Sequence, residues 1–344
     1  MEVVKFLAFP AAELLFLCLH FITKIVKLRK HPNLHVPPGS LGWPVVGETF
    51  SYLRAKGRNT VRFVTERMGK YDSRVFKTSF LGDPMAVLCG LAGNKFLFAM
   101  RTKMSKDGFH PRSTQEFRAK NGYHCSAPHK HSLASGRFMT ETEIIDNLLQ
   151  LLFSGHNTTR SVISSIMKYL GDLPEVYEQV LKEQLEISRG KGTGELLQWE
   201  DAQKMKYSWN VASEVMRLSP PVNTNFKEAI RDFNYAGYTI PKGWKLRWAT
   251  CSTHMDPEYF PNPEAFDASR FEGEGPTAYS YVPFGRGPRM CLGIELARLE
   301  IPVFMHHIVE RFKWDLVNPD EKFKYDPLLE PVKGLPVRLH PRHV

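Results

Sequence analysis

The stretch "PFGRGPRMCLG", residues Pro283 to Gly293, places a single cysteine among glycines and arginines, directly before a segment with helical character. The chain has five cysteines, and none has C-x-x-C spacing. A disulfide framework and a multi-cysteine zinc or iron–sulfur site are therefore not expected. Gly287 and Gly293 would let the backbone pass close to a flat ligand. The fold must thus present one isolated thiol, Cys291, where a helix begins.

The surroundings of Cys291 suit a thiolate metal ligand. A helix amino terminus and the neighbouring Arg289 both favour the thiolate form. A lone thiolate fits haem iron better than zinc or an iron–sulfur cluster, which need several ligands. Arg289 is also placed to form a charge-assisted hydrogen bond with a haem propionate.

The charge distribution argues against nucleic-acid binding. The chain has 344 residues, 42% of them apolar, and a formal net charge of +10. The excess of positive charge lies in residues 24–30 and 101–137, and the remainder of the chain is balanced. A basic face spread over the folded domain, as nucleic-acid binding requires, is not expected.

Residues 6–23 form an apolar stretch followed by a basic cluster. No A-x-A cleavage site follows, and the positive-inside bias would keep the basic cluster in the cytosol. We expect a signal-anchor with the main domain facing the cytosol; the alternative is a buried or interfacial helix. Pro37 and Pro38 make the following segment a stiff connector.

Periodicity and punctuation predict the order of the elements. Helices are expected over residues 60–71, from residue 94, over 140–170, 174–187, 199–219 and 293–311, and strands over 74–80, 85–89 and within 233–250. Thr140 and Glu143 form a capping box at the start of the long apolar helix, which we expect to be central in the core. Pro174 would begin the next helix. Pro302 lies within the last one.

Residues 101–137 have neither a helical nor a strand period and are rich in basic and small residues. Such a stretch is too long for an ordinary loop of a compact domain. Four residues of types that ligate metals lie close together in this stretch: His124, Cys125, His129 and His131. We do not expect them to bind a metal, because no regular structure fixes their positions relative to one another.

Phe284, Gly287, Arg289, Cys291 and Gly293 match the pattern F-x-x-G-x-R-x-C-x-G. In this pattern the chain resembles the haem-thiolate monooxygenases, the cytochromes P450. The resemblance implies that Cys291 ligates the iron of haem b, with the other four residues around the cofactor.

Two further segments resemble the same family. Glu214 and Arg217 form the family's E-x-x-R, on one face of a helix, and Arg270 would complete an ion-pair triad that supports the haem side. Ser154–Thr159 resembles the oxygen-activation groove, in which Gly155 would open the helix and Thr158 would donate a hydrogen bond to the oxygen being activated. Asn157 stands where the family usually has a carboxylate, and an amide cannot relay a proton by titrating.

Further segments over residues 32–100 and 138–344 are similar to the plant terpenoid-oxidising branch that includes the β-amyrin 28-monooxygenases. The resemblance implies a mainly α fold with small β-sheets and a NADPH–cytochrome P450 reductase as partner. It also implies a hydrophobic terpenoid substrate, triterpenoid- or sterol-like. Residues 221–226 and 328–335 would line the pocket that binds it. The chain would be held in the endoplasmic reticulum membrane, in contact with lipid, by one amino-terminal anchor, with a cytosolic catalytic domain.

The chain is much shorter than members of this family, and the helices that wall the distal pocket are missing between residues 99 and 138. We expect four parts: an anchor (1–31), a proline-rich hinge with the first β and helical part (32–100), a basic insert (101–137) and the haem-binding part (138–344).

One hypothesis for the origin of this chain is a splice variant, pseudogene or incorrect gene structure. The alternatives to a monooxygenase are an inactive product that does not assemble haem, and a reductase-independent hydroperoxide-rearranging enzyme, which Thr158 disfavours.

Overall fold

The structure is a computed structural model that describes residues 34–43, 46–54, 59–100, 105–107, 140–192, 195–325 and 328–342. The helices are α2 (Thr49–Arg54), α3 (Asn59–Tyr71), α4 (Gly90–Ala99), α7 (Glu141–Asp172), α8 (Pro174–Arg189), α9 (Trp199–Lys204), α10 (Lys206–Leu218), α11 (Cys251–His254) and α12 (Ile294–Arg311), with short 3-10 turns η1 (Ala268–Phe271) and η2 (Gly287–Arg289). The strands are β1 (Val75–Phe80), β2 (Asp83–Leu88), β3 (Ser105–Asp107), β4 (Thr224–Ala229), β5 (Phe233–Tyr235), β6 (Tyr238–Ile240), β7 (Lys245–Ala249), β8 (Phe312–Leu316), β9 (Phe323–Tyr325), β10 (Leu329–Pro331) and β11 (Val337–Pro341).

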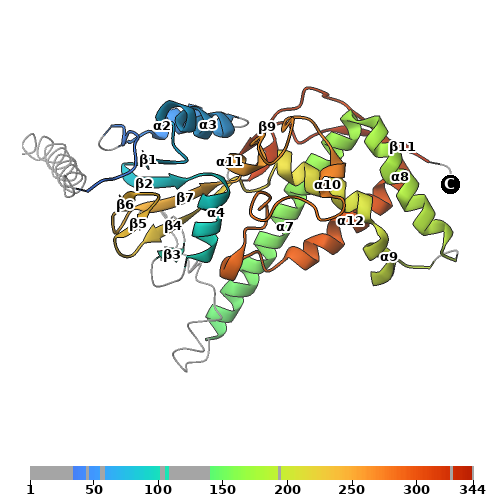
Figure 1. Cartoon of the computed structure of the whole chain (residues 1–344). Coiled ribbons are helices and arrows are strands. Elements are labelled where there is room, and N and C mark those ends of the chain that lie inside the picture. The colour runs from blue at the N-terminus through green and yellow to red at the C-terminus, as the bar shows by residue number, and fades with distance from the viewer. Residues whose placement is uncertain are drawn as a thin grey trace, which may run out of the picture.

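Figure 1 shows a sheet on one side of the molecule and a group of helices on the other. The sheet has the order β1-β2-β7-β4-β3, and only the pairing of β2 with β7 is parallel. Successive residues of a strand point to opposite faces of a sheet. Residues Phe76, Met85 and Val87 accordingly pack on Phe63 and Val64 of α3. The intervening residues, among them Val75, Ala86 and Leu88, pack on Leu97 of α4.

The helical side has its own core. Helices α7, α8, α10 and α12 meet there, and the fully buried Ile166, Val215 and Met305 come from three of them. The prediction of a mainly helical fold with small sheets is confirmed. Helix α12 runs unbroken from Ile294 to Arg311 with Pro302 inside it, as the sequence predicts.

Helix α7 begins at the predicted capping box, with the Thr140 hydroxyl accepting from the Glu143 N–H. Its two halves differ in burial. Residues from Ser161 onward contribute to the core, whereas the apolar side chains of the first half are exposed: Ile144, Ile145, Leu148, Leu149, Leu151, Leu152 and Phe153. In Figure 1 this half extends away from the other helices. The prediction that the whole helix is central in the core is therefore wrong for its first half, because no described element packs over it.

The prediction of a single helix over residues 199–219 is also wrong. The segment forms two helices, α9 and α10, separated at Met205, whose backbone is not helical. The reason lies on another helix. The Glu183 carboxylate of α8 accepts from the backbone N–H groups of Tyr207 (2.7 Å) and Ser208 (2.9 Å) and from the Ser208 hydroxyl (2.6 Å). A carboxylate at these free N–H groups favours a new helix start.

The predicted anchor and most of residues 101–137 lie outside the described residues. Of the latter stretch, Ser105–Asp107 form β3, which pairs with β4. Among the residues that the structure describes, no helix combines the length and apolar character needed to cross a bilayer.

The unequal burial of α7 gives a test of the fold. Ile166 is completely buried, and its replacement by alanine should lower the free energy of unfolding by about 2–5 kcal/mol. Leu148 on the same helix is 55% exposed, and Leu148→Ala should change that free energy by about 0.5 kcal/mol or less. Urea unfolding followed by circular dichroism measures both values. Equal losses for the two variants would contradict the described packing of α7.

Candidate functional site

A fully buried ion pair joins two of the predicted site residues on α10. The Arg217 Nε and Nη2 groups donate to the two carboxylate oxygens of Glu214, each at 2.7 Å, and both side chains are completely inaccessible to solvent. Their spacing of three residues places them on one face of the helix. Planar, two-bonded contact of this kind is the strongest geometry for such a pair.

Arg217 also fixes segments that are distant in sequence. Its remaining N–H groups donate to the carbonyl oxygens of His254 (2.7 Å), Pro263 (2.7 Å) and Ala265 (3.3 Å). A guanidinium has five N–H donors, and each of them here has an acceptor. The buried charge is thus fully solvated by the protein, and α10 is bound to α11 and to the segment that follows it.

Glu214 is bound in turn by the segment that carries Arg270. Its Oε1 accepts from the Asp267 N–H at 2.9 Å, and the Arg270 Nε lies 3.5 Å from the same oxygen. The structure therefore brings together Glu214, Arg217 and Arg270, the three residues that the sequence assigned to one triad.

Cys291 lies on the loop that leads into α12. Its N–H donates to the carbonyl oxygen of Phe284 at 2.9 Å, which closes the loop around η2. The Cys291 thiol is exposed, whereas Cys89 and Cys251 are buried. Burial raises the pKa of Cys251 to about 11 and raises that of Cys89 further. Among the described cysteines, Cys291 is therefore the one that a ligand can reach.

The glycines of this loop serve different purposes. Gly287 has a φ of +75°, and a Cβ there would lie 2.4 Å from the carbonyl oxygen of Phe98 at the end of α4. The glycine is thus required by the approach of α4, independently of the ligand clearance that the sequence suggested. A Cβ at Gly293 would have only the Cys291 Sγ within reach, at 4.0 Å.

The predicted oxygen-activation segment lies on the middle of α7. A Cβ added to Gly155 would meet no atom of the described residues within 4 Å, so the helix surface is open there with respect to them. The Thr158 hydroxyl donates to the Ser154 carbonyl at 2.6 Å, and the Asn157 amide donates to the Phe153 carbonyl at 3.1 Å. Both side chains therefore direct their hydrogens to their own helix, and the lone pairs of Thr158 remain available as acceptors.

Neighbouring elements flank this part of α7 on two sides. The Thr159 hydroxyl lies 3.4 Å from a carboxylate oxygen of Glu300 on α12, the helix that follows Cys291. On the other side, the Ser161 hydroxyl donates to the carbonyl of Leu329 at 2.6 Å, and the Leu329 N–H donates to the Pro221 carbonyl at 3.2 Å. The structure thus brings together α7, which carries the predicted oxygen-activation segment, and α12, which follows Cys291. It also joins α7 to the two segments predicted to line the pocket, residues 221–226 and 328–335.

The residues around Cys291 fit a haem group. The thiol and the Arg289 side chain are exposed on the same loop, and Leu292 and Leu296 expose apolar surface beside them (85% and 53%). No group of three or more histidine, cysteine, aspartate or glutamate side chains could hold a metal ion among the described residues. One accessible cysteine, one arginine and apolar surroundings suit an iron macrocycle.

Sequence reasoning did not single out His254. Its buried ring accepts from the Val282 N–H through Nε2 (2.9 Å) and its Nδ1 lies 3.3 Å from the Arg217 carbonyl. Nothing in the sequence distinguishes it from the other histidines, because its partners lie 37 and 28 residues away.

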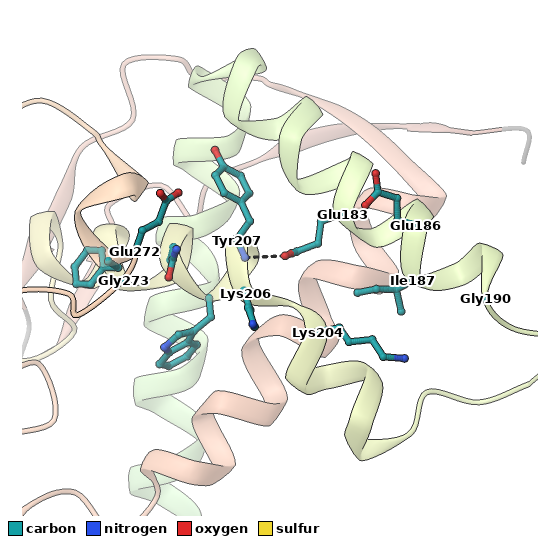
Figure 2. A pocket seen from close by; sticks show the side chains of 12 residues that line it. Glu183, Glu186, Ile187, Gly190, Lys204, Lys206, Tyr207, Glu272 and Gly273 are labelled. Atoms are coloured by element: carbon teal, nitrogen blue, oxygen red, sulfur yellow. Dashed lines mark hydrogen bonds between the residues drawn. The ribbon is translucent and has the colours of Figure 1, made fainter.

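A separate hollow of about 970 Å³ lies between α8, α9, α10 and the segment after η1, and Figure 2 shows its lining. Glu183, Lys206 and Glu272 give it mixed charge, and the Tyr207 N–H donates to Glu183 between two of the lining residues. None of the predicted site residues lines it. It is therefore not part of the candidate site.

Comparison with known proteins identifies the family of the chain. Residues 110–335 match the family described as Cytochrome P450. The chain is 38% identical to the β-amyrin 28-monooxygenase of Kalopanax septemlobus (90% of this chain and 92% of that protein) and 38% identical to that of Vitis vinifera (92% and 95%). The solved structure of retinoic acid-bound cyanobacterial CYP120A1 matches with a TM-score of 0.74 and 24% identity, over 90% of this chain and 100% of that chain.

The two sequence alignments extend over 445 and 457 positions, more than the 344 residues of this chain. The relatives therefore contain residues inside the aligned span for which this chain has no counterpart.

The buried ion pair predicts a large effect of a small substitution. Glu214→Gln leaves the Arg217 charge buried without its carboxylate, and should lower the free energy of unfolding by about 3–5 kcal/mol. Glu295→Gln is the matched control, because Glu295 pairs with Arg298 at the same spacing on α12 but both side chains are largely exposed. Its effect should be about 1 kcal/mol or less. Urea unfolding measures the free energy of unfolding of both variants. If Glu214→Gln lowers it no more than Glu295→Gln does, Glu214 and Arg217 do not form a buried ion pair.

His254 predicts a specific pH dependence of stability. Burial lowers the pKa of its ring from 6.5 to about 3, so between these values the unfolded chain binds a proton that the folded chain does not. The free energy of unfolding should therefore fall as the pH is lowered through this window, by up to about 1.4 kcal/mol per pH unit from this residue. His254→Gln cannot titrate, and unfolding measured at several pH values between 4 and 7 should give a shallower slope. Identical slopes would contradict the buried neutral ring.

Proposed function

The chain belongs to the cytochrome P450 family, and from this membership we propose that it oxidises a hydrophobic terpenoid, triterpenoid- or sterol-like, with dioxygen. The electrons would come from NADPH through the NADPH–cytochrome P450 reductase. The observation that carries this proposal is the exposed Cys291 thiol on a loop that His254 joins to the Glu214–Arg217 pair. Similarity to β-amyrin 28-monooxygenases over nine tenths of the chain supports the substrate class.

The cofactor of the proposed reaction is haem b. Cys291 would ligate its iron and Arg289 would pair with a propionate, while Phe284, Gly287 and Gly293 would shape the loop that carries them. When bound, a thiolate-ligated haem iron supplies the cleavage of dioxygen and the transfer of one oxygen atom to a C–H bond. The protein contributes the position of the thiolate, the binding of the substrate and the handling of protons.

Thr158 is the proposed proton-handling residue. Its hydroxyl hydrogen points to the Ser154 carbonyl, so its oxygen would accept a hydrogen bond from a water or a substrate hydroxyl. Donation toward the ligand requires rotation of the hydroxyl away from Ser154. Asn157 cannot titrate and is bound to Phe153, so it contributes a fixed dipole and no proton.

The exposed apolar residues favour a hydrophobic substrate. Val222 and Val332, in the two segments that meet through Pro221 and Leu329, are 38% and 54% exposed. The first half of α7 adds further uncovered apolar surface, from Ile144 to Phe153. Surface of this kind binds polycyclic hydrocarbon better than polar metabolites.

We also propose that the chain is held in the endoplasmic reticulum membrane by its amino-terminal segment. This rests on the apolar stretch of residues 6–23 and the basic residues after it. The membrane would supply a sparingly soluble substrate and would contain the reductase.

The activity can be tested with the full chain, co-expressed with the reductase and given β-amyrin. We expect an oxidised product that depends on NADPH, and its loss in Cys291→Ala. Cys251→Ala, which removes a buried thiol away from the site, should retain the product. Analysis of extracts by mass spectrometry measures the outcome.

Three other results would overturn the proposal in different ways. Haem retained without any turnover of triterpenoids or sterols would contradict the substrate class. Conversion of a hydroperoxide without NADPH and reductase would favour the rearranging alternative. A chain that retains no haem would be the inactive product.

A further inference from the structure

His254 occupies a position between the buried ion pair and the loop that carries Cys291. Its side chain is 1% exposed and lies at the end of α11. Its own carbonyl oxygen accepts from the Arg217 guanidinium at 2.7 Å, so the residue is fixed to the ion pair through its backbone. Its ring then faces the start of the cysteine loop.

The bonds of the ring define its protonation state. The Val282 backbone N–H can only donate, so the Nε2 atom at 2.9 Å must carry a lone pair. The hydrogen of a neutral ring is therefore on Nδ1, from which it donates to the Arg217 carbonyl at 3.3 Å. Burial lowers the pKa of the ring to about 3, in agreement with a neutral imidazole.

A continuous series of contacts leads from the ring to the thiol. Val282 is 2% exposed, and its carbonyl accepts from the Gly285 N–H at 3.1 Å. Two residues after Val282, the Phe284 carbonyl accepts from the Cys291 N–H at 2.9 Å. The ring of Tyr281 stacks on His254 at 5.4 Å, and its hydroxyl donates to the Ser213 carbonyl of α10. The start of the loop is thus held to α10 through one histidine and one tyrosine.

From this geometry we propose that His254 is a positioning residue, whose Nδ1–H tautomer joins the Arg217 carbonyl to the Val282 N–H and so sets the position of Cys291. The inference rests on the proposed role of Cys291 as a haem ligand. It adds a residue that accepts a hydrogen bond from the cysteine loop and is distinct from the Glu214–Arg217–Arg270 triad.

Three substitutions separate the hydrogen bonds from the bulk of the ring. In His254→Gln the amide oxygen reaches the place of Nε2 and can accept from Val282. In His254→Asn the shorter amide reaches the place of Nδ1 and can bind only the Arg217 carbonyl. His254→Phe keeps an aromatic ring against Tyr281 but makes neither bond. His340→Asn, on a largely exposed histidine, is the control.

The first measurement is amide hydrogen exchange at Val282 in the full chain without haem. We expect the protection of this amide to fall by about tenfold or more in the Phe and Asn variants, and to stay near the original value in the Gln and control variants. Equal protection in the Phe and Gln variants would overturn the proposal, because the ring would then act through its bulk.

The second measurement uses the haem-loaded chain. The fraction that shows a thiolate-type band in the reduced carbon-monoxide difference spectrum should fall in the Phe and Asn variants and recover in the Gln variant. An unchanged fraction in the Phe variant would also overturn the proposal. If no variant or parent chain binds haem, the proposed function fails, and the exchange of Val282 still tests His254 by itself.

If the Phe and Asn variants do not fold, the proposal is tested by the tautomer of the His254 ring in the unmodified chain. Nitrogen-15 spectra of labelled histidine, with the signal of His254 identified by its absence in His254→Gln, should show a hydrogen on Nδ1. A hydrogen on Nε2 would contradict the bond from Val282 and overturn the proposal.

Discussion

The ion pair between Glu214 and Arg217 is the interaction on which the site depends. A charge without access to water is stable only if the protein supplies all of its hydrogen bonds. Arg217 obtains them from Glu214 and from three carbonyl groups, and Glu214 also accepts from the Asp267 N–H. The Arg270 Nε lies 3.5 Å from the Glu214 carboxylate and adds an ion pair without a hydrogen bond. Segments up to about fifty residues away must therefore take up one arrangement around α10, because any other would leave a buried charge without partners.

This arrangement carries over to the cysteine loop. The carbonyl of Arg217 and its guanidinium both bind His254, and the ring of His254 binds the first buried residue of the loop. The loop itself remains exposed at Cys291. A rigid, fully bonded base below an accessible thiol is the arrangement that a cofactor ligand requires, since the position of the sulfur atom is then fixed before the cofactor binds.

The opposite side of the site is built differently. The second half of α7 is packed in the core, whereas the apolar side chains from Ile144 to Phe153 are exposed. The relatives have additional residues within the aligned span. Among the described residues, the first half of α7 is thus the part of this helix that no other element covers.

The elements that could be predicted from the sequence are those whose signals are local. The capping box at Thr140, the proline at the start of α8 and the period of β1 and β2 all stabilise their own segments. The break between α9 and α10 escaped prediction because Glu183, on another helix, supplies the cap. The role of Gly287 depends on Phe98, and that of His254 on Val282, so neither could be read from neighbouring residues. The exposure of the first half of α7 could not be predicted from its own apolar sequence, because it reflects that no described element packs over it.

The central claim is that the buried pair on α10 supports a loop from which Cys291 ligates haem iron. The carbon-monoxide difference spectrum of the reduced, purified full chain tests it most directly, because the position of the absorption band reports the axial ligand. The account predicts a thiolate-type Soret band that disappears in Cys291→Ala. A chain that retains no haem, or a bound haem whose spectrum is the same with and without Cys291, would contradict it.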